Sequence, residues 1–225
     1  MEVAQRRTYQ EVTGLLLEGS VDAAWLCGYP YMQHRDRLAL LGAPVWQGQP
    51  LYQSYLIVAP DDAAAGLADL ENGIHAFSDP DSNSGWLVTA ADLRAIGRRP
   101  EEFFARTIFC WGHRNVVRAV AGGLVRSGSV DGYVWEALAE IEPDLTARTR
   151  VLARSEWLGF PPFVVRADRM DEPGIRAFRD ALLGMETTEA GRAALALLRL
   201  DSIGPAQPSL YNGILSRMQA LNASP

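Results

Sequence analysis

Along the chain, segments with apolar residues at helical spacing alternate with short, continuous apolar runs. Residues 8–18 carry apolar side chains at helical spacing, between a capping Thr8 and a terminating Gly19. The apolar run 21–26 that follows predicts a short buried strand. A helix, a glycine stop and an apolar strand form half of a β–α–β unit, so the pattern predicts an α/β protein with a parallel sheet.

The same reasoning extends to the rest of the chain. The predicted strands are 42–45, 52–58, 74–77, 107–111, 129–134 and 150–153. The predicted helices are 67–70, 87–93, 116–124, 135–141, 175–183, 190–200 and 211–221. Within 155–165, one glycine and two prolines interrupt an apolar run, which is typical of a chain crossing between lobes.

Composition narrows the classes of protein. A chain of 225 residues with 48% hydrophobic residues can form one large domain or two lobes, each with a core. The net charge of −6 argues against a partner with a phosphate backbone, so no nucleic acid is expected. The longest apolar runs are far shorter than the ~20 residues that span a bilayer, so no membrane span is expected.

The two cysteines and the N-terminus say less about function. Cys27 and Cys110 lie in apolar stretches without disulfide or zinc spacing, so we expect two reduced, buried thiols. The first residues lack the apolar core of a secretion signal, which indicates a cytoplasmic protein or a mature or truncated form.

A polar stretch follows the predicted strand 74–77 and holds the strongest candidate chemistry. Ser82, Asn83, Ser84 and Gly85 precede a predicted helix, whose first turn leaves backbone N–H groups without partners. These amides, the helix dipole and the two serine hydroxyls suit an oxyanion, and glycine permits its close approach. An ordinary capped helix after a turn is the alternative.

Other strand ends carry polar or aromatic residues, and ligands of α/β sheets lie outside the carboxyl ends of strands. His113 can donate to an anion, or can be a cap or surface residue. Asp131 can accept from a cationic or hydroxyl group, or can cap the next helix. Tyr29 and Tyr31 follow the strand 21–26, where contact with a ligand and plain packing both stay open.

Several signatures then line up in order along almost the whole chain. They are TYQEV, GSVDAAWLCGYPYM, YQSYLIV, FSDPDSNSGWL, GHRNVVRAVAGGLV, GSVDGYVWEAL and SEWLGFPPFVV. The series resembles the periplasmic phosphate/phosphonate-binding proteins of ABC transporters, a branch of the type II periplasmic-binding-protein fold. The resemblance implies two α/β lobes with mixed, mainly parallel sheets, flanking helices and a ligand cleft between the lobes. Lobe 1 would comprise 1–56 and 163–225, without the family's usual first strand and helix, and lobe 2 would comprise 57–162.

The resemblance also implies a set of ligand-binding residues. They are Tyr9, Tyr29, Tyr31, Ser82, Asn83, Ser84, Gly85, His113 and Asp131. The Ser82–Gly85 segment would hold phosphate-like oxygens, Tyr9 and His113 would add donors, and Asp131 would bind the organic or hydroxyl end. Asn83 stands where family members often carry threonine.

The leading hypothesis is a solute-binding protein for a small oxyanion or phosphonate-like ligand, without catalytic residues, metal or cofactor. The resemblance implies a monomer that serves an ABC permease. It would be periplasmic or extracellular if the N-terminus is truncated, and cytoplasmic if the sequence is complete. The alternative is a small lyase or transferase on the same fold, using His113 with Asp131 or Glu156 as an acid–base pair. Against it, the chain lacks a nucleophile and base at recognisable spacing, a metal cluster and a phosphate-loop lysine.

Overall fold

The computed structural model describes residues 2–222, which divide into two compact units. Over these residues, unit 1 comprises 2–51 and 158–215, and unit 2 comprises 52–157 and 216–222. Each unit is therefore built from separate stretches of the chain. The predicted lobe boundaries, at 56/57 and 162/163, stay a prediction.

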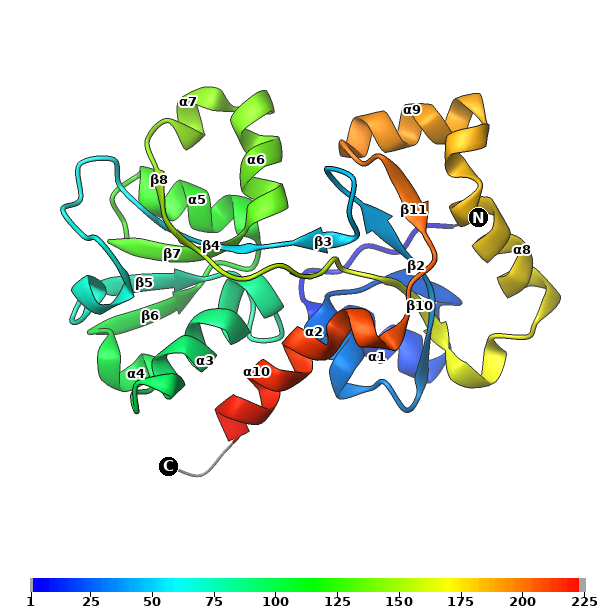
Figure 1. Cartoon of the computed structure of the whole chain (residues 1–225), viewed down its shortest axis with the longest axis horizontal. Coiled ribbons are helices and arrows are strands. Elements are labelled where there is room, and N and C mark those ends of the chain that lie inside the picture. Colours follow the sequence, from blue (N-terminus) through cyan, green and yellow to red (C-terminus); the bar gives the residue numbers. More distant parts are fainter. Residues whose placement is uncertain (1, 223–225) are drawn as a thin grey trace. The chain divides into compact units, whose positions relative to one another are not determined.

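Unit 1 is built on a four-stranded sheet in the described residues, and Figure 1 labels β2, β10 and β11 of this sheet. Its order is β1 (Ala23–Trp25), β10 (Phe163–Arg166), β2 (Leu38–Val45) and β11 (Ser202–Gly204). β10 runs antiparallel to both β1 and β2, and β11 runs antiparallel to β2. The expectation of mainly parallel sheets is wrong for this unit. β1 and β2 do point the same way, but β10, which comes from a distant part of the chain, lies between them.

Helices and a short ladder complete unit 1. They are α1 (Tyr9–Glu18), α2 (Gly28–Gln33), η3 (Ala167–Arg169), α8 (Pro173–Leu183), η4 (Met185–Thr187), α9 (Glu189–Leu198), η5 (Pro208–Tyr211) and the first part of α10 (Asn212–Asn222). The α1 boundaries confirm the predicted ones, because Thr8 and Glu11 form a capping box and Gly19 ends the helix at φ 79°. At the unit boundary, β3 (Leu51–Tyr52) pairs with β9 (Leu158–Gly159).

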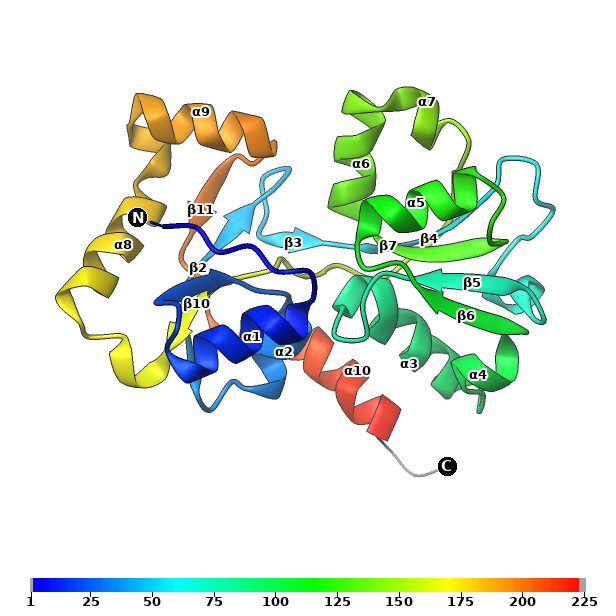
Figure 2. The same cartoon turned by 180° about the vertical axis from the view of Figure 1, so that it is seen from behind.

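Unit 2 contains a five-stranded mixed sheet (Figures 1 and 2). Its order is β6 (Arg106–Phe109), β5 (Ile74–Phe77), β7 (Ser127–Asp131), β4 (Ser54–Val58) and β8 (Arg150–Arg154). β5 is parallel to β6 and β7, whereas β4 is antiparallel to β7 and β8. The mixed character that the sequence predicts is confirmed, and the parallel pairs are those around β5.

The remaining elements belong to unit 2. They are η1 (Leu67–Leu70), η2 (Asn83–Leu87), α3 (Val88–Ala95), α4 (Pro100–Phe103), α5 (His113–Ala121), α6 (Gly132–Ile141) and α7 (Pro143–Thr146). Alternate side chains of β4 enter two different cores, as a strand buried on both faces requires. Ile57 packs with α5, α6 and α7, and Val58 packs with α3 and α4. These helices cover the two faces of the sheet in Figures 1 and 2.

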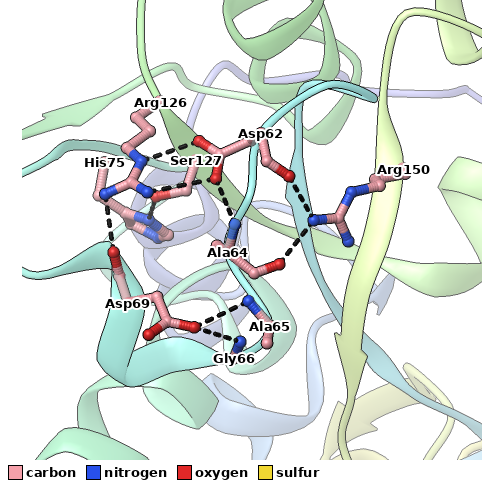
Figure 3. Close-up of polar contacts among 9 residues, drawn as sticks. All are labelled: Asp62, Ala64, Ala65, Gly66, Asp69, His75, Arg126, Ser127 and Arg150. Atoms are coloured by element: carbon pink, nitrogen blue, oxygen red, sulfur yellow. Dashed lines mark hydrogen bonds and ion pairs between the residues drawn. The ribbon is translucent and has the colours of Figure 1, made fainter.

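An arginine cluster fixes the edge of this sheet where β4 ends (Figure 3). Arg126 binds both carboxylate oxygens of Asp62, at 2.8 and 3.2 Å, and donates to the backbone oxygen of Asp69 at 2.7 Å. Arg150 donates to the backbone oxygens of Asp62 and Ala64. Because Val58 pairs with Ser127, at the opposite end of β7 from Asp131, this cluster lies at the far edge from the candidate site.

Candidate functional site

Three strand ends of unit 2 meet at one edge of its sheet. β5, β6 and β7 are parallel neighbours, so the residues after Phe77, after Phe109 and at Asp131 lie at the same edge. Two backbone hydrogen bonds extend the β5–β6 pairing beyond the strands, from Cys110 N to Phe77 O (2.8 Å) and from Gly112 N to Ser78 O (3.2 Å). The edge therefore gathers the polar stretch 78–85, the start of α5 and the start of α6.

The polar stretch forms a turn and then an unusually wound helix start. Asp79 Oδ1 accepts from Asp81 N (2.8 Å), and Asp79 O accepts from Ser82 N (3.0 Å). η2 then begins in π-helical geometry, because Leu87 N donates to Ser82 O, five residues back, at 3.0 Å. Single π-turns inside helices are frequent at functional sites.

Ser82 is the N-cap of this helix, as its position in the sequence predicts. Its Oγ accepts from Gly85 N at 2.9 Å. The hydroxyl proton of Ser82 is not used in that bond, and its donation to an anion stays a prediction. The capped-helix interpretation and the anion interpretation are thus compatible in this geometry.

Gly85 is needed for a close contact within the loop. A Cβ on Gly85 would lie 1.8 Å from Ser78 Oγ and 2.9 Å from Ser82 Oγ. Ser78 N also donates to Gly85 O at 3.1 Å. The space beside the Gly85 Cα is therefore filled by Ser78, and an approach of an oxyanion to the Gly85 backbone stays a prediction.

Asn83 and Ser84 are buried and hydrogen-bonded to residues of β3 and β4, respectively. Asn83 Nδ2 donates to the Tyr52 hydroxyl (2.8 Å), and Ser84 O accepts from Ser54 Oγ (2.6 Å). Tyr52, Ser54 and Ser78 were missed by the sequence reasoning. Ser54 could have been identified from the sequence, because it is a hydroxyl residue at the start of an otherwise apolar strand. In the structure Ser54 pairs in register with Asp131.

His113 is held in one neutral tautomer at the start of α5. Its Nδ1 lies 3.1 Å from Asp131 N, and a backbone N–H can only donate, so Nδ1 accepts and Nε2 carries the proton. Burial lowers the pKa of His113 to about 4. The side chain is therefore a neutral hydrogen-bond donor through Nε2 at neutral pH.

Asp131 ends β7 and caps α6. Its Oδ1 accepts from Val134 N at 3.2 Å, which confirms the capping alternative. The predicted strand 129–134 is therefore too long, because Gly132 already belongs to α6. Burial raises the pKa of Asp131 to about 7, since its side chain is 5% exposed. Its role towards a ligand stays a prediction.

The acid–base pairs of the enzyme alternative are not formed in unit 2. His113 Nδ1 faces the backbone nitrogen of Asp131, not its carboxylate. Glu156 is bound by Arg217, through Nε at 2.8 Å and through a second short contact from Nη2. Arg217 also binds Asp92 at 2.7 Å. Glu156 thus anchors the middle of α10 through Arg217, and this structural role accounts for its carboxylate.

The predicted tyrosines belong to unit 1 and are described within it. Tyr9 is the first residue of α1, and Tyr29 and Tyr31 lie on α2. Tyr31 is buried and meets Tyr211 edge-on, with ring centroids 4.9 Å apart, so the packing alternative is realised for this residue. The ligand-binding role of the three tyrosines stays a prediction.

Residues 2–222 also bear, through their side chains and helices, on metal binding, membrane spanning and disulfide formation. Their His, Cys, Asp and Glu side chains do not gather into a group of three suited to a metal ion. Their helices include none with the length and apolar character needed to cross a bilayer. Cys27 and Cys110 do not form a disulfide.

Comparisons with known proteins agree with the motifs. A family profile described as "ABC transporter, phosphonate, periplasmic substrate-binding protein" matches residues 1–211. A search of curated proteins returns no match. Among solved structures, a binding protein component of an ABC phosphonate transporter from Pseudomonas aeruginosa is 22% identical, with a TM-score of 0.88, over 99% of this chain and 78% of that one. PhnD1 from Prochlorococcus marinus, in complex with methylphosphonate, is 17% identical, with a TM-score of 0.83, over 96% and 84%. A Xanthomonas citri protein bound to chloride is 18% identical, with a TM-score of 0.79, over 98% and 84%.

Proposed function

Because the chain belongs to the phosphonate periplasmic substrate-binding family of ABC transporters, we propose that it binds a small phosphonate-like oxyanion at the edge of the unit 2 sheet where β5, β6 and β7 end. Membership of this family confirms the resemblance inferred from the motifs, and with it a binding rather than a catalytic role. The proposal adds the ligand class and the residues that hold it.

One observation carries the proposal: a helix start with two hydroxyl side chains stands beside a neutral histidine donor at a shared edge. Ser82 caps η2 through its oxygen lone pair, which leaves its proton for an anion. His113 carries its proton on Nε2, because Nδ1 accepts from Asp131 N. Donors with fixed orientation at the positive end of a helix favour an anion over a neutral solute.

The charge of the whole protein supports a local site rather than a general attraction. The chain carries a net charge of −6, so the average field repels anions. Affinity must then come from hydrogen bonds at short range. This favours small, compact anions that can satisfy several donors at once.

We also propose that the chain is a monomer that delivers its ligand to an ABC permease from the periplasm. The family description supports the transporter and the compartment. Mass measurement of the purified chain in solution tests the monomer, and binding to a permease in vesicles tests the partner.

The site is tested by ligand-dependent thermal stabilisation of the whole chain. Methylphosphonate, phosphite, phosphate and sulfate are the probes, and Ser82→Ala with Ser84→Ala is the test variant. A ligand at ~100 times its Kd adds roughly 2.7 kcal/mol to the free energy of unfolding, and we expect this gain only without the double substitution. The matched control replaces the exposed serines Ser20 and Ser209 by alanine.

For each variant, the stability with ligand is compared with the stability of the same variant without ligand, because loss of the Ser82 cap alone costs about 1 kcal/mol. If a ligand stabilises the control variant but not the test variant, the result supports the proposed site. An undiminished response in the test variant removes these serines from the site. No response of the unsubstituted chain to any probe overturns the proposed function.

A further inference from the structure

Trp111 stands directly beside the polar stretch, at the end of β6. Its two neighbours in sequence bind the start of that stretch: Cys110 N donates to Phe77 O, and Gly112 N donates to Ser78 O. His113 follows two residues later. The backbone of Trp111 is therefore fixed at the same sheet edge as the proposed anion donors.

The backbone at Trp111 has an unfavourable conformation for a bulky residue. Its φ is 55°, in the left-handed region where a large side chain is rare. Side chains held in this way gather at ligand sites, where the surrounding structure maintains the strain. Here the hydrogen bonds of Cys110 and Gly112 supply that constraint.

The indole of Trp111 is only partly buried. It is 39% exposed, although it continues an aromatic row from Phe77 through Phe109, with ring centroids 5.8 and 6.1 Å apart. The row runs from the core of unit 2 towards the edge, and its last ring is the exposed one. An apolar, flat side chain thus ends this row at the carboxyl end of β6, the sheet edge at which the polar stretch and the start of α5 also lie.

We propose that Trp111 determines specificity by receiving the organic substituent of the ligand, so that the site prefers an alkylphosphonate to inorganic phosphate. This inference rests on the proposed function. Inorganic phosphate presents oxygen at all four corners, and an oxygen against an indole face loses water without gaining a hydrogen bond. A carbon at that corner has no such loss and gains apolar contact.

The test compares Kd values for methylphosphonate and inorganic phosphate, measured by calorimetry on the full chain. In Trp111→Ala we expect the preference for methylphosphonate to fall about tenfold, the scale of one methyl contact in an apolar pocket. Most of the change should come from weaker methylphosphonate binding. Trp111→Phe should keep most of the preference, since it retains an aromatic face.

Tryptophan emission gives an independent measurement. Methylphosphonate should change the emission of the unsubstituted chain, and Trp111→Phe should lose that change while it still binds. The inference is overturned if Trp111→Ala weakens the binding of both ligands equally, or if the emission change persists in Trp111→Phe. Either result leaves the proposed function standing. Absence of binding by the unsubstituted chain overturns both.

Discussion

Replacing Gly85 by alanine tests the packing of the loop that carries the candidate site. Gly85 lies in η2 and its φ is not positive, so its backbone is compatible with alanine. By helix propensity alone, the substitution would stabilise the chain by about 1 kcal/mol. The new Cβ would lie 1.8 Å from Ser78 Oγ and 2.7 Å from Ser78 Cβ, distances that no pair of non-bonded atoms adopts.

The loop must therefore shift, and the substitution should destabilise the chain instead of stabilising it. Overpacking of a buried site costs about 1–3 kcal/mol, and Ser78 and Gly85 are also joined through Ser78 N and Gly85 O. For a chain of this length, each kcal/mol lowers Tm by roughly 2–4 °C. We expect Gly85→Ala to lower the free energy of unfolding by about 1–3 kcal/mol. The variant should also lose its response to methylphosphonate, because Ser82 and Ser84 would be displaced.

Thermal and urea unfolding measure the effect, with two comparisons. Gly14, inside α1, has nothing within 4 Å of an added Cβ, so Gly14→Ala should be as stable as the unsubstituted chain or more so. Adding Ser78→Gly to Gly85→Ala removes the two closest atoms and should recover most of the stability. If Gly85→Ala behaves like Gly14→Ala, the reasoning from close approach is refuted.

Further predictions concern buried titratable groups and backbone strain. Folded Asp131 keeps its proton up to about pH 7, whereas the unfolded chain loses it near 3.8, so its contribution to stability falls as pH rises between these values. Asp131→Asn keeps the cap and should abolish that fall, seen as a higher urea midpoint at pH 8 but not at pH 4. The pKa of buried His75 is lowered to about 3, so its contribution is lost as pH falls from 6.5 towards 3. His75→Gln should therefore reduce the acid loss of stability, and an unchanged pH profile would contradict this. Because Trp111 has φ 55°, Trp111→Gly should be more stable than Trp111→Ala by about 1 kcal/mol in urea unfolding.

The elements themselves were readable in the sequence because local chemistry determines their ends. Thr8 and Gly19 bound α1 through a capping box and a left-handed C-cap, as their residue types predict. The strand before the polar stretch, 74–77, is β5 without a change of boundary. Ser82 as an N-cap follows from the same local rule.

The sheet of unit 1 could not be read in this way, because its order depends on pairing between distant segments. The insertion of β10 between β1 and β2 joins residues about 120 to 140 positions apart in the chain, and no local pattern encodes it. A helix–strand alternation predicts the direction of β1 and β2, but it does not predict what lies between them.

The buried polar network of unit 2 was hidden for a similar reason. His75 lies between Ser127 Oγ (2.7 Å) and Ser129 Oγ (2.9 Å), and Ser129 reaches Thr89 Oγ1 (2.6 Å) on α3. In the sequence these are single polar residues on strands and a helix that are far apart. Only the parallel pairing of β5 with β7 brings them together, and with it fixes the helix that follows the polar stretch.

These contacts bear on the affinity expected of the proposed anion site in a chain without net positive charge. Ser84 O is held by Ser54, Asn83 by Tyr52, and Gly85 N by Ser82, so the polar stretch is attached at three consecutive residues before any ligand arrives. A loop that is already ordered loses little conformational entropy on binding, so more of the hydrogen-bond energy appears as affinity. Within the proposal, the Ser82 hydroxyl and the neutral His113 imidazole are the donors, since Ser82 Oγ accepts from Gly85 N and His113 Nδ1 accepts from Asp131 N. An anion site in an acidic protein can work on this basis, because orientation of a few neutral donors replaces the charge that the rest of the chain does not provide.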